Sequence, residues 1–141
     1  MRDVHANNLS IDFDLYCLDI AHKIVLETNT RIKYFPKEYA LTLTKPIENA
    51  ANMAESKLKS AISYRNRSSR KEYLTRESLL NEAVYYLNLL SNKINLAYRL
   101  FHLNCGEKQG NKILSCEQIS SWQSPINEEL TLICNQNRLI L

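Results

Sequence analysis

The sequence predicts an all-α protein, and three observations support this prediction. Only two glycines and three prolines occur among the 141 residues, whereas sheets joined by many turns need more of both. Apolar residues recur at helical three- and four-residue spacings over long stretches. The composition, 45% hydrophobic and 23% charged, is typical of a folded globular domain. We therefore expect residues 1–141 to form one domain, an up-down-up-down four-helix bundle with helices at about 10–33, 37–63, 69–103 and 116–137.

The first predicted helix covers residues 10–33. Ser10 is a suitable N-cap because its hydroxyl can accept a hydrogen bond from a backbone N–H of the first turn. Two adjacent apolar stripes follow at helical spacing, namely Ile11, Leu15, Leu18, Ala21, Val25 and Phe13, Cys17, Ile20, Ile24. The positions left for solvent are Asp12, Asp14, Asp19 and Lys23. The acids among them lie in the first turns, where the helix dipole favours negative charge.

The second predicted helix covers residues 37–63. Pro36 suits its first turn because a proline at that place loses no hydrogen bond. One stripe follows at spacings of three and four, namely Leu43, Ile47, Ala50, Ala54, Leu58 and Ala61. Pro46 lies inside this pattern. Either the helix kinks at Pro46, or the helix proper begins near Thr44 after a short turn.

The third predicted helix, residues 69–103, is the longest and carries two apolar stripes. The first consists of Leu80, Val84, Leu87, Leu90, Ile94, Ala97 and Phe101. The second includes Leu79, Tyr86, Leu89, Leu96 and Leu100. One bundle core needs only one of these stripes, so we expect the second to form a contact between subunits of a homo-oligomer.

A loop and a fourth helix complete the prediction. The stretch "NCGEKQGN", residues 104–111, contains both glycines, and Gly106 directly after Cys105 is a typical helix stop. Ser115 and Gln118 have the spacing of a capping box, which would open a helix at about 116. Its stripe consists of Ile119, Trp122, Ile126, Leu130 and Ile133.

Positive charge is concentrated in the middle of the chain. The net charge is −3 over residues 1–30, +8 over residues 31–112 and −2 over residues 113–141. Between residues 57 and 76 a single acid, Glu72, opposes seven cations, namely Lys57, Lys59, Arg65, Arg67, Arg70, Lys71 and Arg76. Arginine forks and nearby serine hydroxyls suit the oxygens of a sugar–phosphate backbone. This segment therefore predicts a surface for RNA or DNA, while the alternative from composition alone is a solvated connector between two helices.

The sequence gives no support to catalysis or to a bound metal. His5, His22 and His102 are scattered, and no Glu-x-x-His pattern of a di-iron bundle occurs. His102 and Cys105 have the spacing of metal ligands, but no second pair follows. We expect no catalytic residue, no metal and no cofactor. The four cysteines lack a CxxC spacing, and we expect them to be reduced and mostly buried.

The sequence also bears on where the protein resides. No apolar run approaches the ~18–20 residues of a membrane span, and the first residues lack the apolar core of a signal peptide. Together with reduced cysteines, this predicts a cytoplasmic protein that does not enter a membrane.

Three stretches of the chain carry a resemblance to a known family. They are Phe35–Tyr39 ("FPKEY"), Ile47–Ala50 ("IENA") and Arg70-Lys71 with Leu74 and Leu87 further on. In their order, over roughly residues 13–103, the parts resemble the accessory variability determinants (Avd) of diversity-generating retroelements. This family is related in fold to proteins encoded by intervening sequences in bacterial 23S ribosomal RNA genes.

The resemblance implies a non-enzymatic four-helix bundle that forms a barrel-like homopentamer. Such a protein would bind the reverse transcriptase of a retroelement and its template RNA, and so support mutagenic cDNA synthesis. The resemblance places the basic surface of the family on Arg65, Arg67, Arg70, Lys71 and Arg76, with Lys93 and Arg99 further along the third helix. The alternative is a structural interaction protein of the ribosomal intervening-sequence type, without a polymerase partner.

Overall fold

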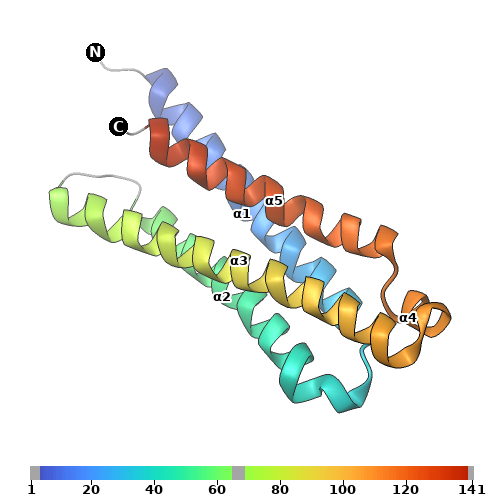
Figure 1. Cartoon of the computed structure of the whole chain (residues 1–141). Helices are drawn as coiled ribbons and strands as arrows, with labels where there is room; N and C mark the ends of the chain where they lie inside the picture. Colours follow the sequence, from blue (N-terminus) through green and yellow to red (C-terminus); the bar gives the residue numbers. More distant parts are fainter. Residues whose placement is uncertain (1–3, 65–68, 140–141) are drawn as a thin grey trace.

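The computed structural model describes the backbone of residues 4–64 and 69–139, and the side chains of residues 13–64 and 69–135. Within these ranges the chain is helical and contains no strand, which confirms the all-α class (Figure 1). The elements are α1 (Val4–Ile32), the short 3₁₀ turn η1 (Lys37–Tyr39), the π turn η2 (Ala40–Thr44), α2 (Lys45–Ser63), α3 (Arg70–Cys105), α4 (Glu107–Ile113) and α5 (Cys116–Leu139).

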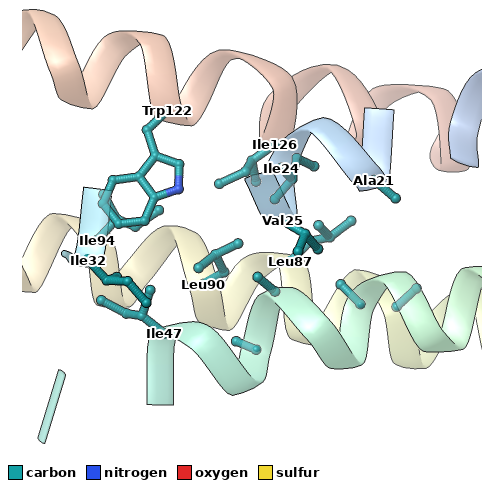
Figure 2. Packing of buried hydrophobic residues seen from close by; sticks show 14 of the residues in the cluster. Ala21, Ile24, Val25, Ile32, Ile47, Leu87, Leu90, Ile94, Trp122 and Ile126 are labelled. Atoms are coloured by element: carbon teal, nitrogen blue, oxygen red, sulfur yellow. The ribbon is translucent and has the colours of Figure 1, made fainter. Parts of the chain in front are cut away.

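The four long helices enclose one apolar core. α1 packs against α2 and α5, and α3 packs against α2, α4 and α5. The apolar stripes predicted from the sequence meet in the centre, where Ile47, Leu87, Leu90, Ile94 and Ile126 are fully buried. Figure 2 shows these side chains pointing from different helices into the same space. The periodicity of the sequence therefore identified most of the core.

Trp122 fills one end of this core without leaving its indole N–H unpaired. In Figure 2 the indole points from α5 toward α3. Its Nε1 donates to the hydroxyl of Thr28, 3.0 Å away, and that hydroxyl donates to the carbonyl of Ile24 at 2.7 Å. A buried tryptophan needs such an acceptor, because an unpaired N–H in an apolar core is costly. Thr28 is thus a buried polar residue with a structural role.

The first helix begins earlier than predicted and buries one of its acids. α1 starts at Val4, so Ser10 lies inside the helix and is not its N-cap. Residues 4–9 contain no glycine or proline that would end the helix. Asp14, predicted to face solvent, is 1% exposed. Asp19 and Lys23 are exposed as predicted.

The structure decides between the two alternatives for the second helix. α2 begins at Lys45, after the two short turns η1 and η2. Pro46 therefore occupies the first turn of α2, where its missing N–H is not required. The second alternative, a start near Thr44 after a short turn, is confirmed.

Caps define the ends of the next two long helices. The hydroxyl of Ser69 accepts a hydrogen bond from the N–H of Glu72 and caps α3. Gly106 ends α3 with a φ of 83°, a conformation that glycine adopts without strain. The capping box of α5 is confirmed, since Ser115 N–H donates to Gln118 Oε1 at 2.9 Å and Gln118 N–H donates to Ser115 Oγ at 3.2 Å.

The predicted loop at residues 104–111 is largely a helix. After the break at Gly106, α4 runs from Glu107 to Ile113 and packs against the end of α3. Gly110 is buried there, and a Cβ at this position would lie 2.9 Å from the Cα and the Cγ of His102. The imidazole Nε2 of His102 also lies 3.0 Å from the carbonyl of Leu114. The second glycine thus permits close packing of two helices and does not mark a turn.

Replacing Gly110 with alanine is expected to destabilise the protein by about 1–3 kcal/mol, as overpacking does in a tight core. A Gly→Ala change inside a helix normally stabilises it, because glycine has more backbone freedom to lose on folding. Urea unfolding of Gly110→Ala beside Asn111→Ala, an exposed position of the same helix, measures the effect. A Gly110→Ala variant as stable as the wild type would contradict the packing described.

Candidate nucleic-acid interface

The end of α2 and the beginning of α3 bring cationic side chains to one end of the molecule. Lys57 and Lys59 lie in the last two turns of α2, and Arg70 and Lys71 form the first turn of α3. We call these four residues the described basic surface. Arg65 and Arg67, which the sequence assigns to the same surface, lie outside the described residues.

The two lysines of α2 are engaged by acids that lie just outside the basic segment of residues 57–76. Lys57 Nζ lies 2.9 Å from Glu82 Oε2, and Lys59 Nζ lies 3.5 Å from Glu55 Oε1. Neither acid lies within residues 57–76. The net charge counted over that segment therefore overstates the positive charge that α2 presents. Lys59 is the more accessible lysine, with 62% of its side chain exposed against 28% for Lys57.

Arg70 and Lys71 are the most available cations of this surface. Both are exposed, and neither side chain forms a hydrogen bond or an ion pair within the described part of the chain. They line an open groove together with Leu74, Thr75, Ser78 and Leu79. They also stand at the positive end of the α3 dipole, which favours an anion at this place.

Arg76 does not belong to this surface. Only 2% of it is exposed, and its guanidinium is directed inward. Its Nη2 lies 3.0 Å from Asp14 Oδ1, and its Nη1 donates to the carbonyl of Ala61 at 3.2 Å. The assignment of Arg76 to nucleic-acid binding is therefore wrong for the folded chain, because the charge is already neutralised inside it.

Lys93 and Arg99 are on α3 but not near the described basic surface. At 1.5 Å per residue they lie roughly 35–45 Å along the helix from Arg70. Lys93 is half-buried and Arg99 is exposed. The structure therefore divides the predicted cations into a group at one end of the molecule and two separate charges further along α3.

The second apolar stripe of α3 is only partly open to solvent. Leu79, Tyr86, Leu89 and Leu100 are half-buried and pack against the edge of the core, whereas Leu96 is 41% exposed. More exposed apolar side chains lie next to this stripe, with Tyr85 at 61% and Leu74 at 49%. The apolar side chains of α3 that a partner could contact are therefore mainly those beside the predicted stripe, on the more exposed side of the helix.

A buried polar cluster joins all four long helices near Arg76, and the sequence reasoning missed it. Besides the pair of Arg76 and Asp14, it includes Glu129 of α5 and Cys17 of α1. Glu129 is fully buried, and neither carboxylate oxygen has a well-aligned hydrogen-bond partner among the described residues.

The ionisation of Glu129 follows from this burial. Loss of hydration raises the pKa of Glu129 from 4.5 to about 8, the adjacent thiol of Cys17 acts in the opposite direction, and Glu128 raises the pKa further. Burial and the nearby carboxylates also raise the pKa of the Cys17 thiol. At neutral pH both groups are therefore mainly protonated.

Apart from Asp14, Arg76 and Glu129, the described part of the chain contains no buried charged side chain. No group of three His, Cys, Asp or Glu side chains there is placed to hold a metal ion. His22 is exposed beside Glu55, and His102 packs against Tyr98; the His5 side chain lies outside the described residues. All four cysteines are free thiols, and only Cys17 is buried. The expectation that most of them are buried is therefore wrong, since Cys116 and Cys134 are exposed on α5.

No helix among residues 4–64 and 69–139 has the length and apolar character that a membrane span requires. Comparison with known proteins finds no match to a family model, to a curated protein or to a solved structure.

Proposed function

We propose that this chain is a non-enzymatic, cytoplasmic nucleic-acid-binding accessory protein. Its partners would be a retroelement reverse transcriptase and the template RNA of that enzyme, and its role would be to support mutagenic cDNA synthesis. The observation that supports nucleic-acid binding is the pair of exposed, unengaged cations Arg70 and Lys71 at the start of α3. The polymerase and the template come from the family resemblance.

The chemistry of the basic end favours a phosphate backbone over an acidic protein surface. Arg70 and Lys71 adjoin the capped N-terminus of α3, so that side-chain and dipole charges act on the same anion. Tyr64 is 36% exposed at the end of α2, and an accessible ring beside cations can stack on an unpaired base. These features suit single-stranded RNA or DNA better than a duplex.

The assembly belongs to the same proposal. The four long helices would form an up-down-up-down bundle, and copies of the bundle would associate with one another. The resemblance implies five subunits. Association would repeat the basic surface around the assembly and raise its affinity for one long nucleic acid without any new contact.

Removing the basic charges tests the binding. Changing Arg65, Arg67, Arg70 and Lys71 to alanine is expected to weaken binding of a fluorescent single-stranded RNA by at least about tenfold, because phosphate contacts supply most of the non-specific affinity. Fluorescence anisotropy at constant salt measures the dissociation constant.

A matched control separates a local surface from overall charge. Four other exposed lysines lie elsewhere on the molecule, namely Lys23, Lys33, Lys37 and Lys112. Changing all four to alanine alters the net charge by the same amount as the Arg65/Arg67/Arg70/Lys71 variant. We expect this control to retain most of the affinity. Equal affinity in the wild type and in the Arg65/Arg67/Arg70/Lys71 variant would refute the proposed surface and favour the structural interaction protein without a polymerase partner.

A further inference from the structure

We propose that the outward face of α3 binds a second copy of this chain, with the two α3 helices antiparallel about a two-fold axis near Asn88. The face is a ridge of side chains at helical spacing that we call the outer ridge, namely Leu74, Ser78, Asn81, Tyr85, Leu89, Asn92 and Leu96. It contains no charged residue. Leu74, Tyr85 and Leu96 expose 41–61% of their surface, and such exposed apolar side chains in a row are typical of an interface.

Opposite charges flank the outer ridge in a self-complementary order. Glu77 and Arg99 lie toward one side of the outer ridge, because 22 residues are close to six turns of helix; Arg99 is in line with Asn81 at the edge of the ridge, five turns further on. Glu82 and Lys93 lie on the other flank, 11 residues or about three turns apart. On each flank the acid is thus nearer the start of α3 and the base nearer its end.

This order fits an antiparallel pair and disfavours a parallel one. A two-fold axis across α3 sets each flank against the same flank of the second copy, in reverse direction. Glu82 then faces Lys93 of the second copy, and Glu77 faces Arg99 of the second copy, because the midpoints of both pairs fall at about residue 88. A parallel pair about a two-fold axis along α3 would instead bring opposite flanks together, with Glu82 nearest Glu77 of the second copy and Lys93 nearest Arg99 of the second copy, which is repulsive.

The same axis also matches the uncharged side chains. Tyr85 and Leu89 are centred near the axis, so the most exposed tyrosine of α3 meets a leucine of the second copy. Ser78 meets Leu96 of the second copy, which gives Leu96 a small residue to pack on. Alternation of large and small residues across such a contact permits close approach of two helices.

The flanking charges are available for this contact. The side chains of Glu77, Lys93 and Arg99 form no hydrogen bond or ion pair within the described part of the chain. Glu82 is engaged with Lys57, but 48% of its side chain remains exposed. A groove beside the first half of the ridge, lined by Leu74, Asn81, Tyr85 and their neighbours, offers space for a side chain of the second copy.

This inference rests on the proposed self-association, and it does not depend on nucleic-acid binding. A two-fold contact is the same patch on both copies and closes as a dimer. The pentamer implied by the resemblance would need a different, head-to-tail contact. The mass of the assembly distinguishes the two, whatever the result of the RNA experiment.

Charge reversal and exchange test the contact with the intact chain. Glu77→Arg/Glu82→Lys and Lys93→Glu/Arg99→Glu are each expected to raise the dissociation constant of the dimer by at least about tenfold, since like charges then face each other on both flanks. An equimolar mixture of the two variants should recover the dimer. So should the single chain that carries all four changes. Light scattering and sedimentation velocity give the mass in each case.

Controls show whether the effect is local. Asp19→Lys/Glu48→Lys changes the net charge by the same amount as Glu77→Arg/Glu82→Lys, at exposed positions of α1 and α2, and it should leave the dimer intact. Circular dichroism checks that each variant is folded. A monomeric wild type, a wild-type pentamer, or a folded four-change variant that fails to associate would each overturn the proposal.

Discussion

Replacing Asp14 with asparagine is expected to cost about 3–5 kcal/mol of stability, because the charge of Arg76 then remains buried without its counter-charge. Both side chains of the pair are 2% exposed, and Arg76 Nη2 lies 3.0 Å from Asp14 Oδ1. The same guanidinium also binds the carbonyl of Ala61 near the end of α2. The pair therefore links α1, α2 and α3 at one place, and its loss affects all three.

Thermal unfolding followed by circular dichroism measures this prediction. For a domain of this size the loss corresponds to a fall in Tm of roughly 10–15 °C. Asp19→Asn is the matched control, since Asp19 is exposed on the same helix and should change stability by less than about 0.5 kcal/mol. The double change Asp14→Leu/Arg76→Met should recover much of the loss, because apolar side chains of similar size can replace a buried pair. Equal Tm values for Asp14→Asn and Asp19→Asn would contradict this account.

Glu129 is expected to make the protein less stable as the pH rises from about 4.5 to about 8. The folded chain keeps the carboxyl protonated up to its raised pKa of about 8, whereas the unfolded chain ionises above 4.5. Over this range the unfolded state binds fewer protons than the folded state, so the free energy of unfolding falls with pH. The loss of stability caused by keeping this carboxyl buried is absent below pH 4.5. It is complete above pH 8, where it lowers the free energy of unfolding by at most about 4–5 kcal/mol.

The variant Glu129→Gln removes this pH dependence because its amide has nearly the same shape and never ionises. We expect the free energy of unfolding of Glu129→Gln to match that of the wild type near pH 4 and to exceed it clearly at pH 9. Glu117→Gln, at an exposed position of the same helix, should show no such gain. The measurement is the free energy of unfolding in urea at several pH values. Parallel pH profiles for Glu129→Gln and the wild type would rule out a neutral buried carboxyl.

The elements and the core could be predicted from the sequence because helical periodicity reports burial directly. The stripe Leu80, Leu87, Leu90, Ile94 and Phe101 is buried as predicted. The exact beginning of α1 and the presence of α4 could not be predicted in this way. A glycine in the sequence predicts a turn unless its neighbours in space are known. The close contact of Gly110 with His102 could not be predicted, because it depends on how α3 and α4 pack.

The burial of these charges has a signal in the sequence, which a count of charges along the chain does not detect. Asp14 is in phase with the stripe of Ile11 and Leu18, and Glu129 is in phase with Ile126 and Ile133. A charged residue at such a position is on the buried side of its helix. Which charge would pair with which could not be predicted, because the partners lie on different helices.

The position of the candidate interface could be predicted from the sequence, but not which of the cations are available on its surface. The connection between α2 and α3 does carry exposed cations, but Arg76 is inside the core and Lys57 is paired with Glu82. A count of charges along the chain cannot detect either effect, because both depend on contacts between helices.

The salt dependence of RNA binding tests most directly the claim that the basic end of the molecule binds a phosphate backbone. The dissociation constant for a short single-stranded RNA is measured between about 50 and 200 mM salt, for the wild type and for the chain with Arg65, Arg67, Arg70 and Lys71 changed to alanine. We predict a linear fall of the logarithm of affinity with the logarithm of salt, and a slope smaller by about 3 in the variant, because four phosphate contacts are lost. Identical slopes, or an affinity that does not change with salt, would contradict the claim.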